Sequence, residues 1–215
     1  MFSPRLDILP PSQRRLWNEL KEIPPEFVLY GGTAIALYLG HRESADFDFF
    51  GDRPLDPNNL TLAIPFLAGA TVTQREPNTL SCVVDRGGPV KVAFFPGVPR
   101  LRLPSIAPDN GLRVASLIDL AGMKASVVQM RAEAKGYIDI GAILAEGGID
   151  LPAALASARA IYGSQFNPQI TLKALSYFDD GDLPRLPRAL KDRLARAVSA
   201  VDLDRLPVVT ARPGD

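Results

Sequence analysis

Tyr30-Gly31-Gly32-Thr33, followed by Asp46-Phe47-Asp48, is the stretch of this chain that decides its fold. Phe27 to Tyr30 is a short apolar run, which predicts a buried strand that ends at the two glycines. Thr33 to Leu39 has a helical pattern. Ala45 to Phe50 alternates Asp with Phe, as a strand with unlike faces does. The stretch therefore predicts a strand, a tight turn, a helix and a second strand.

This order of elements places a site for an anion next to a site for a cation. Gly31 and Gly32 let the backbone turn tightly and approach a ligand, and the helix after them presents unpaired N–H groups and a positive dipole end. Asp46 and Asp48 share one face of their strand, about 6.6 Å apart along it. Such carboxylates can hold Mg²⁺, which also takes phosphate oxygens. Alone, a Gly-Gly pair is usually a turn and Asp-Phe-Asp a solvated strand face, but together they indicate nucleoside triphosphate chemistry.

Composition narrows the chemistry further. The 215 residues carry 24 Lys plus Arg and 24 Asp plus Glu, so no excess charge points to DNA, a membrane or an acidic ligand. Cys82 is the one cysteine and His41 the one histidine, which excludes an intramolecular disulfide framework, a cysteine-based zinc cluster and a multi-histidine metal site. A catalytic metal must rest on oxygen ligands. Residues 1–17 lack a signal-peptide pattern, and no apolar run approaches the ~20 residues of a membrane span, so we expect a cytoplasmic protein without membrane association.

The chain reads as an α+β amino-terminal half, residues 1–110, followed by an all-helical half, residues 111–215. The Pro/Gly-rich stretch from Pro96 to Gly111 separates them. In the first half we expect helices at 12–22 and from Asp56-Pro57 toward Gly69, and consecutive antiparallel strands at 71–75, 80–85 and 90–95. In the second half we expect a helix from Val114 that is interrupted at Gly136 and ends at Gly147-Gly148, then helices at 151–161, 168–178 and 187–201.

Residues 31–50, GGTAIALYLGHRESADFDFF, resemble the AbiEii/AbiGii-type toxin nucleotidyltransferases of the polymerase-β-like superfamily. Residues 114–144 are similar to the helical region of that family, and the resemblance spans roughly residues 27 to 180. It implies a mixed sheet flanked by helices, then a helical domain, with the active cleft between the halves. It also implies Mg²⁺-dependent transfer of a nucleoside monophosphate from a nucleoside triphosphate to a hydroxyl of tRNA or protein, by the toxin of a toxin–antitoxin pair. A helix-turn-helix antitoxin is an expected partner.

The residues and the resemblance together assign two sets of side chains. Arg42 either reaches a phosphate or pairs with Asp46 or Glu43, and Ser44 either caps or orients Asp46. Thr33 bonds a phosphate, caps its helix, or does both. The catalytic set is Asp46, Asp48, Lys124 and Asp139, with Asp46 and Asp48 as metal ligands; the nucleotide-binding set is Gly31, Gly32, Thr33, Arg42, Ser44 and Lys135.

A cationic stripe is the feature expected of the helical half. Lys124, Arg131 and Lys135 fall within about 40° on one face if their helix is continuous. Such a stripe is more often a solvated face, and the resemblance is what favours phosphate contacts for Lys124 and Lys135.

Two positions depart from the family pattern. Ala93 stands where the superfamily has a third carboxylate, and Gly136 follows Lys135 where an Asp is usual. A methyl group cannot ligate a metal or act as a base. The chain is therefore a weakened enzyme, an enzyme that uses another acid such as Asp139 or Asp85, or a catalytically inactive nucleotide-binding or interaction protein. A plain protein-binding subunit that partners a DNA-binding antitoxin is a further alternative.

Overall fold

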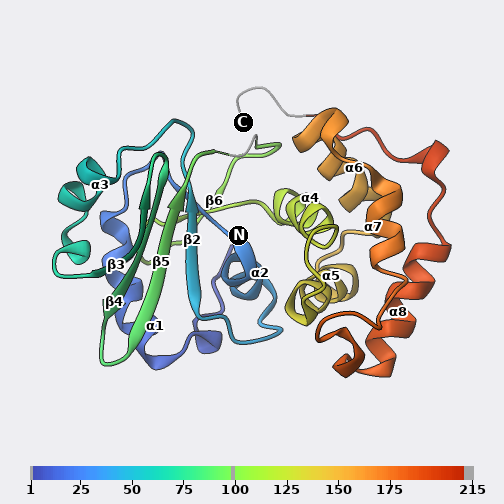
Figure 1. The fold of residues 1–215 in the computed structure, drawn as a ribbon, viewed down its shortest axis with the longest axis horizontal. Helices are drawn as coiled ribbons and strands as arrows, with labels where there is room; N and C mark the ends of the chain where they lie inside the picture. The colour runs from blue at the N-terminus through green and yellow to red at the C-terminus, as the bar shows by residue number, and fades with distance from the viewer. Residues whose placement is uncertain (1, 98–99, 211–215) are drawn as a thin grey trace. The chain divides into compact units, whose positions relative to one another are not determined.

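The computed structural model describes residues 2–97 and 100–210. The chain divides into two compact units, one formed by residues 1–99 and 104–115 and the other by residues 100–103 and 116–215 (Figure 1). Within the described ranges, none of the helices combines the length and the apolar character that crossing a membrane requires.

The first unit is built on a seven-stranded mixed sheet with strand order β3-β4-β5-β2-β1-β7-β6. The central strand β2 runs antiparallel to β1 and parallel to β5, while β3, β4 and β5 form the predicted antiparallel meander. The strands are β1 (Val28–Tyr30), β2 (Asp46–Phe50), β3 (Thr71–Glu76), β4 (Thr79–Asp85), β5 (Pro89–Phe95), β6 (Ser105–Ile106) and β7 (Arg113–Val114).

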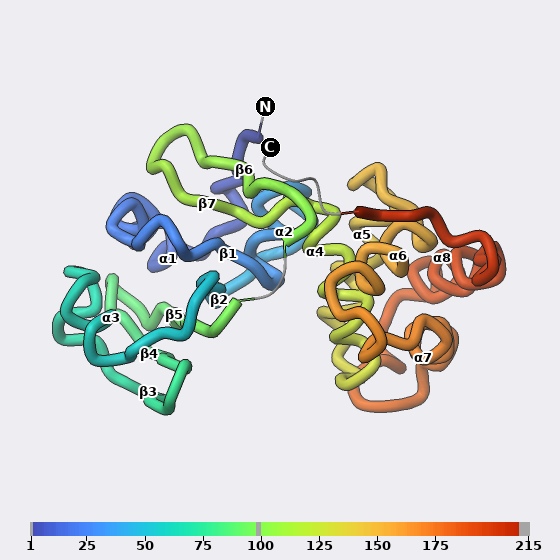
Figure 2. The backbone as a smooth tube through the Cα atoms, turned by 90° about the horizontal axis from the view of Figure 1, so that it is seen from above, coloured from blue at the N-terminus to red at the C-terminus, as the bar shows by residue number. Residues whose placement is uncertain are grey.

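Helices cover this sheet on both sides. Helices α1 (Pro11–Trp17) and α3 (Pro57–Ala63) lie on one face, and α2 (Gly31–Leu39) lies on the other (Figures 1 and 2). A 3₁₀ segment, Asn18–Glu22, continues α1 and another, Pro65–Leu67, follows α3, so the two helices expected here each end in a tighter turn. The predicted alternation of β2 is confirmed, because its phenylalanines are fully buried and its aspartates only partly so.

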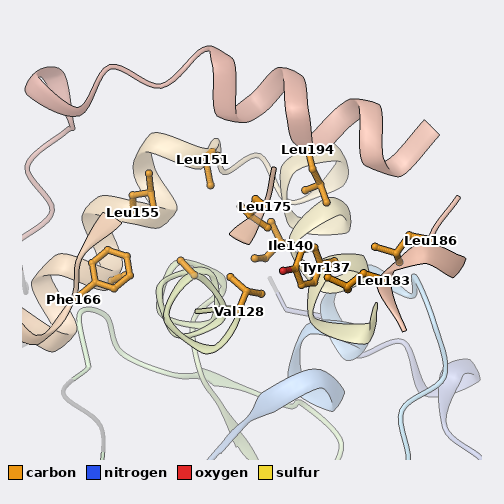
Figure 3. Close-up of a cluster of buried hydrophobic side chains, with 12 residues drawn as sticks. Val128, Tyr137, Ile140, Leu151, Leu155, Phe166, Leu175, Leu183, Leu186 and Leu194 are labelled. Atoms are coloured by element: carbon orange, nitrogen blue, oxygen red, sulfur yellow. The ribbon is translucent and has the colours of Figure 1, made fainter. Parts of the chain in front are cut away.

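The second unit is helical. It contains α4 (Leu117–Val127), α5 (Ala134–Glu146), α6 (Leu151–Tyr162), α7 (Pro168–Ala174) and α8 (Arg188–Ser199). Apolar side chains from all five helices and from the turns between them meet in one core, which includes Tyr137, Leu155 and Leu194 (Figure 3). The phenolic hydroxyl of Tyr137 donates to the carbonyl of Ala174 at 3.1 Å, which gives its buried oxygen a partner.

The expected helix from Val114 is wrong in two places. Arg113 and Val114 form strand β7, with Val114 beside Leu29 of β1, and α4 begins only after Ser116, whose hydroxyl accepts the N–H of Asp119. The helix then breaks between Val127 and Ala134 rather than at Gly136, which lies inside α5 and is buried. The residues in the break favour a helix, so tertiary packing rather than local propensity sets the break.

Gly122 and Gly136 give a matched pair of substitutions in this unit. A Cβ at Gly122 would lie 2.5 Å from Ser157 Oγ and 2.8 Å from the backbone nitrogen of Ala158, because α4 and α6 pack closely there. We expect Gly122→Ala to lower the free energy of unfolding by about 2 kcal/mol. At Gly136 the nearest atom to a Cβ is Val128 Cγ1 at 3.5 Å. Gly136→Ala should therefore be neutral or stabilising by up to about 1 kcal/mol. Urea unfolding followed by circular dichroism measures both, and equal destabilisation of the two variants contradicts this packing.

Candidate active site

The glycine bend leaves the sheet directly beside one of the two aspartates. Tyr30 of β1 pairs with Asp48 of β2, so the residue after Tyr30 turns away from the sheet at Asp48. Gly31 has a φ of +76°, and a Cβ on it would lie 2.8 Å from Asp48 Oδ2. Helix α2 begins at Gly31 without a side-chain cap, so its first N–H groups are left to bind another acceptor. The structure therefore brings together the bend, the helix start and the carboxylate, as the sequence predicts.

Asp46 and Asp48 lie on the face of β2 opposite to its two buried phenylalanines. Both aspartates are partly exposed. Within the described part of the chain, the Asp46 carboxylate makes no hydrogen bond or ion pair. It is therefore available to a cation and is not neutralised by an arginine.

Thr33 and Ser44 connect the start of α2 to the start of β2. The Thr33 side chain is buried, and its hydroxyl hydrogen-bonds to the carbonyl oxygen of Asp46 and lies 2.8 Å from Ser44 Oγ. Since one hydroxyl donates one proton, the Ser44 hydroxyl donates to Thr33 when Thr33 donates to Asp46. These bonds fix the backbone at Asp46. The helix-capping role expected of Thr33 is wrong, because the N-cap is Tyr30 and has no side-chain bond.

The other predicted nucleotide-binding side chains are partly or largely exposed. Arg42 lies in the loop between α2 and β2, where its Nη1 donates to the carbonyl oxygen of Glu43 at 2.9 Å. Lys135 lies in the first turn of α5 in the second unit, with Nζ 3.8 Å from a carboxylate oxygen of Glu133. The continuous stripe of Lys124, Arg131 and Lys135 is wrong, since Arg131 lies in the break between α4 and α5.

Lys124 and Asp139 meet across the α4–α5 hairpin of the second unit. Lys124 Nζ lies 2.7 Å from Asp139 Oδ2, and the Asp139 side chain is completely buried. A buried ion pair of this kind can serve the fold, a reaction, or both. The sequence predicts the two residues but not their pairing, which depends on where α4 ends.

Ala93, the position expected for a third carboxylate, lies beside Asp48 in the sheet, so no acid stands there. Ala93 of β5 pairs with Asp48, and Lys91 pairs with Asp46. Within the described ranges, no cluster of three or more His, Cys, Asp or Glu side chains could hold a metal ion. Two carboxylates nevertheless fit Mg²⁺, which takes one or two of them and completes its octahedron with phosphate oxygens and water. Lys91 was missed by the sequence analysis because only the strand register reveals it.

Asp85 does not replace the missing acid. Its carboxylate accepts the N–H groups of Gly87 at 2.8 Å and Gly88 at 3.0 Å, in the turn between β4 and β5. The bonds from Gly88 and Gly87 lower the pKa of the Asp85 carboxyl below its ordinary value. The structure thus accounts for Asp85 as a turn residue.

Comparisons with known proteins point in one direction. Residues 15–209 match the family model described as nucleotidyl transferase AbiEii toxin, type IV TA system. An uncharacterized protein of Aquifex aeolicus (strain VF5) is 31% identical over 158 residues, which are 72% of this chain and 75% of that protein. MenT4, a nucleotidyltransferase toxin of Mycobacterium tuberculosis H37Rv, aligns with a TM-score of 0.61 and 15% identity, covering 93% of this chain and 84% of MenT4. A candidate nucleotidyltransferase of H. pylori aligns with a TM-score of 0.53 and 15% identity, covering 87% and 92%.

The buried pair allows a test of how much the fold depends on it. Lys124→Met removes the cation and leaves the Asp139 carboxylate buried beside an apolar group, so we expect a loss of about 3 kcal/mol of unfolding free energy. Lys124→Met combined with Asp139→Leu removes both charges and should recover most of that loss. Chemical unfolding of the two variants and the unaltered chain measures this. A single variant as stable as the unaltered chain would show that the pair is not a structural requirement.

Proposed function

Because the chain belongs to the AbiEii family of nucleotidyltransferase toxins, we propose that it is a magnesium-dependent enzyme that transfers a nucleoside monophosphate from a nucleoside triphosphate to a hydroxyl of tRNA or of a protein. The observation that carries this proposal is the approach of Gly31 to Asp48, where a Cβ would lie 2.8 Å from the carboxylate. It places helix N–H groups for an anion next to carboxylates for a cation.

Six residues around the glycine bend and strand β2 have roles in this proposal. Asp46 and Asp48 hold Mg²⁺, and the backbone of Gly31 and Gly32 binds phosphate oxygens at the start of α2. When bound, the metal neutralises negative charge on the phosphates as the reaction proceeds. Thr33 and Ser44 hold the backbone of Asp46 in place. The acceptor oxygen forms its bond to the α-phosphorus as the bond to pyrophosphate breaks, and the hydroxyl proton passes to solvent water.

The family resemblance supplies the proposed roles of four further side chains, those of Lys124, Asp139, Lys135 and Arg42. We assign Lys124 and Lys135 to neutralise phosphate charge and Asp139 to hold Lys124, which its 2.7 Å contact supports. Arg42 is assigned to a phosphate, because its guanidinium can bind one with two hydrogen bonds.

The partners follow from the same membership. The family implies an antitoxin and a nucleotide substrate. We propose that the antitoxin is a helix-turn-helix protein and that the reaction takes place in the cytoplasm, where nucleoside triphosphates and tRNA are found.

One observation favours a second function, in which the chain binds a nucleotide without transferring it. Ala93, beside Asp48, supplies neither a metal ligand nor a base. If the missing group normally activates the acceptor hydroxyl, about 10²–10⁴-fold of rate is absent. Calorimetry with Mg²⁺ and each triphosphate, followed by transfer of radiolabel to tRNA and protein, separates the two functions, since binding without transfer selects the second.

Removal of either metal-binding carboxylate should abolish transfer. Asp46→Asn and Asp48→Asn keep the shape of the side chain and remove its charge, so we expect transfer to fall at least about 10²-fold while the protein stays folded. Glu76→Gln is the control, because Glu76 is an exposed carboxylate on the edge strand β3. Radiolabel transfer and thermal unfolding are measured on all three. Unchanged transfer in both aspartate variants would refute the proposed metal ligands.

Gly31 and Gly40 allow the bend to be tested separately from backbone strain. Both have a left-handed φ, +76° and +66°, at opposite ends of α2, so an alanine destabilises either position by about 1–2 kcal/mol. An alanine at Gly31 also pushes against the Asp48 carboxylate, whereas at Gly40 it meets the flexible guanidinium of Arg5. We expect Gly31→Ala to weaken Mg²⁺-dependent triphosphate binding about 10-fold and Gly40→Ala to leave it unchanged, measured by calorimetry. Equal affinities of the two variants for the triphosphate would show that the bend at Gly31 is not part of the binding site.

A further inference from the structure

Lys91 is the cationic side chain that the sheet places next to the metal-binding carboxylates. Strand β5 runs parallel to β2, with Lys91 beside Asp46 and Ala93 beside Asp48. Paired residues on neighbouring strands lie about 4.8 Å apart and point to the same face of a sheet. Lys91 therefore shares the face of Asp46 and Asp48.

The exposure of Lys91 is unusual for its place in the sheet. Strand β5 lies between β4 and β2, away from either edge. Its other residues from Val90 to Phe94 are buried, and Ala93, on the same face as Lys91, is 1% exposed. Lys91 itself is exposed. The face is therefore open beside Asp46, where a ligand can reach both side chains.

Asp46 and Lys91 do not neutralise each other. Although the register makes them neighbours, neither side chain takes part in an ion pair or a hydrogen bond within the described residues. A lysine that served only to compensate Asp46 would lie against its carboxylate. Here the carboxylate remains available to a cation and the ammonium group to an anion.

Groups that can bind an anion thus lie on both sides of β2, toward β1 and toward β5. On the β1 side, the chain turns at Gly31 into α2, whose first N–H groups can bind an anion. On the β5 side lies the ammonium group of Lys91. A polyphosphate whose metal ion is held by Asp46 and Asp48 would have both features within reach.

Building on the proposed function, we propose that Lys91 binds a phosphate oxygen of the nucleoside triphosphate. Its ammonium group is a compact charge with three donors, which suits a phosphate. Because β5 offers a cation beside Asp46 and a methyl group beside Asp48, this strand contributes to the substrate and not to the metal. Lys91 is thus a triphosphate-binding residue of the site.

Binding measurements test this role without requiring turnover. Calorimetry on the full chain with Mg²⁺ and each of ATP, CTP, GTP and UTP identifies the triphosphate bound. For that nucleotide, Lys91→Ala and Lys91→Gln should raise the Kd about 10-fold, and Lys91→Arg should keep it within about 3-fold. Lys21→Ala is the control, because Lys21 is also an exposed lysine of the first unit and lies in the 3₁₀ segment after α1. Thermal unfolding checks that every variant is folded.

The outcomes separate this inference from the proposed function. Tight binding by the unaltered chain together with unchanged affinity in Lys91→Ala and Lys91→Gln overturns the role of Lys91 and leaves the proposed function standing. An equal loss in Lys21→Ala also overturns it, because the effect is then one of overall charge. If the unaltered chain binds none of the four triphosphates, the proposed function fails and the inference fails with it.

Discussion

The pairing of Tyr30 with Asp48 is the constraint on which the site depends. It makes the chain leave the sheet at Gly31 in a left-handed conformation, so close to Asp48 that a Cβ on Gly31 would lie 2.8 Å from the Asp48 carboxylate. A side chain at this position would carry backbone strain and also press on Asp48. The glycine therefore lets the start of α2 lie directly beside the Asp48 carboxylate. The Thr33 and Ser44 hydroxyls reinforce the arrangement by holding the backbone of Asp46 to α2.

Local patterns in the sequence predict most of the helices and strands. They succeed where a particular residue type requires a particular backbone geometry. The alternating Asp and Phe of β2, the glycine that ends α2 and the Asp56 cap of α3 are all visible without coordinates. The failures occur where the structure is decided by distant contacts. Strands β6 and β7 are two residues each, too short for any alternation, and β7 exists because Val114 meets Leu29. The break after Val127 likewise lies in residues that would suit a helix.

The same division applies to the site. Gly31, Asp46 and Asp48 could be predicted together because they lie within 18 residues of one another on one strand–turn–helix–strand unit. Lys91 could not, because nothing in its own segment shows that it lies beside Asp46; that placement comes from the parallel register of β2 and β5. The predicted stripe through Arg131 failed for a related reason, since helical spacing has no meaning across a turn.

The pairing of Lys124 with Asp139 is difficult to explain by stability alone. Taking a carboxylate and an ammonium out of water costs several kcal/mol for each ion, and well-packed apolar residues in their place are often neutral or more stable. Asp139 is nevertheless completely buried, on a helix that also contributes Tyr137 and Ile140 to an apolar core. A fold selected only for packing has little reason to keep such a pair. The burial of this ion pair therefore supports the proposal that Lys124 has a chemical role and that Asp139 holds its ammonium group in place.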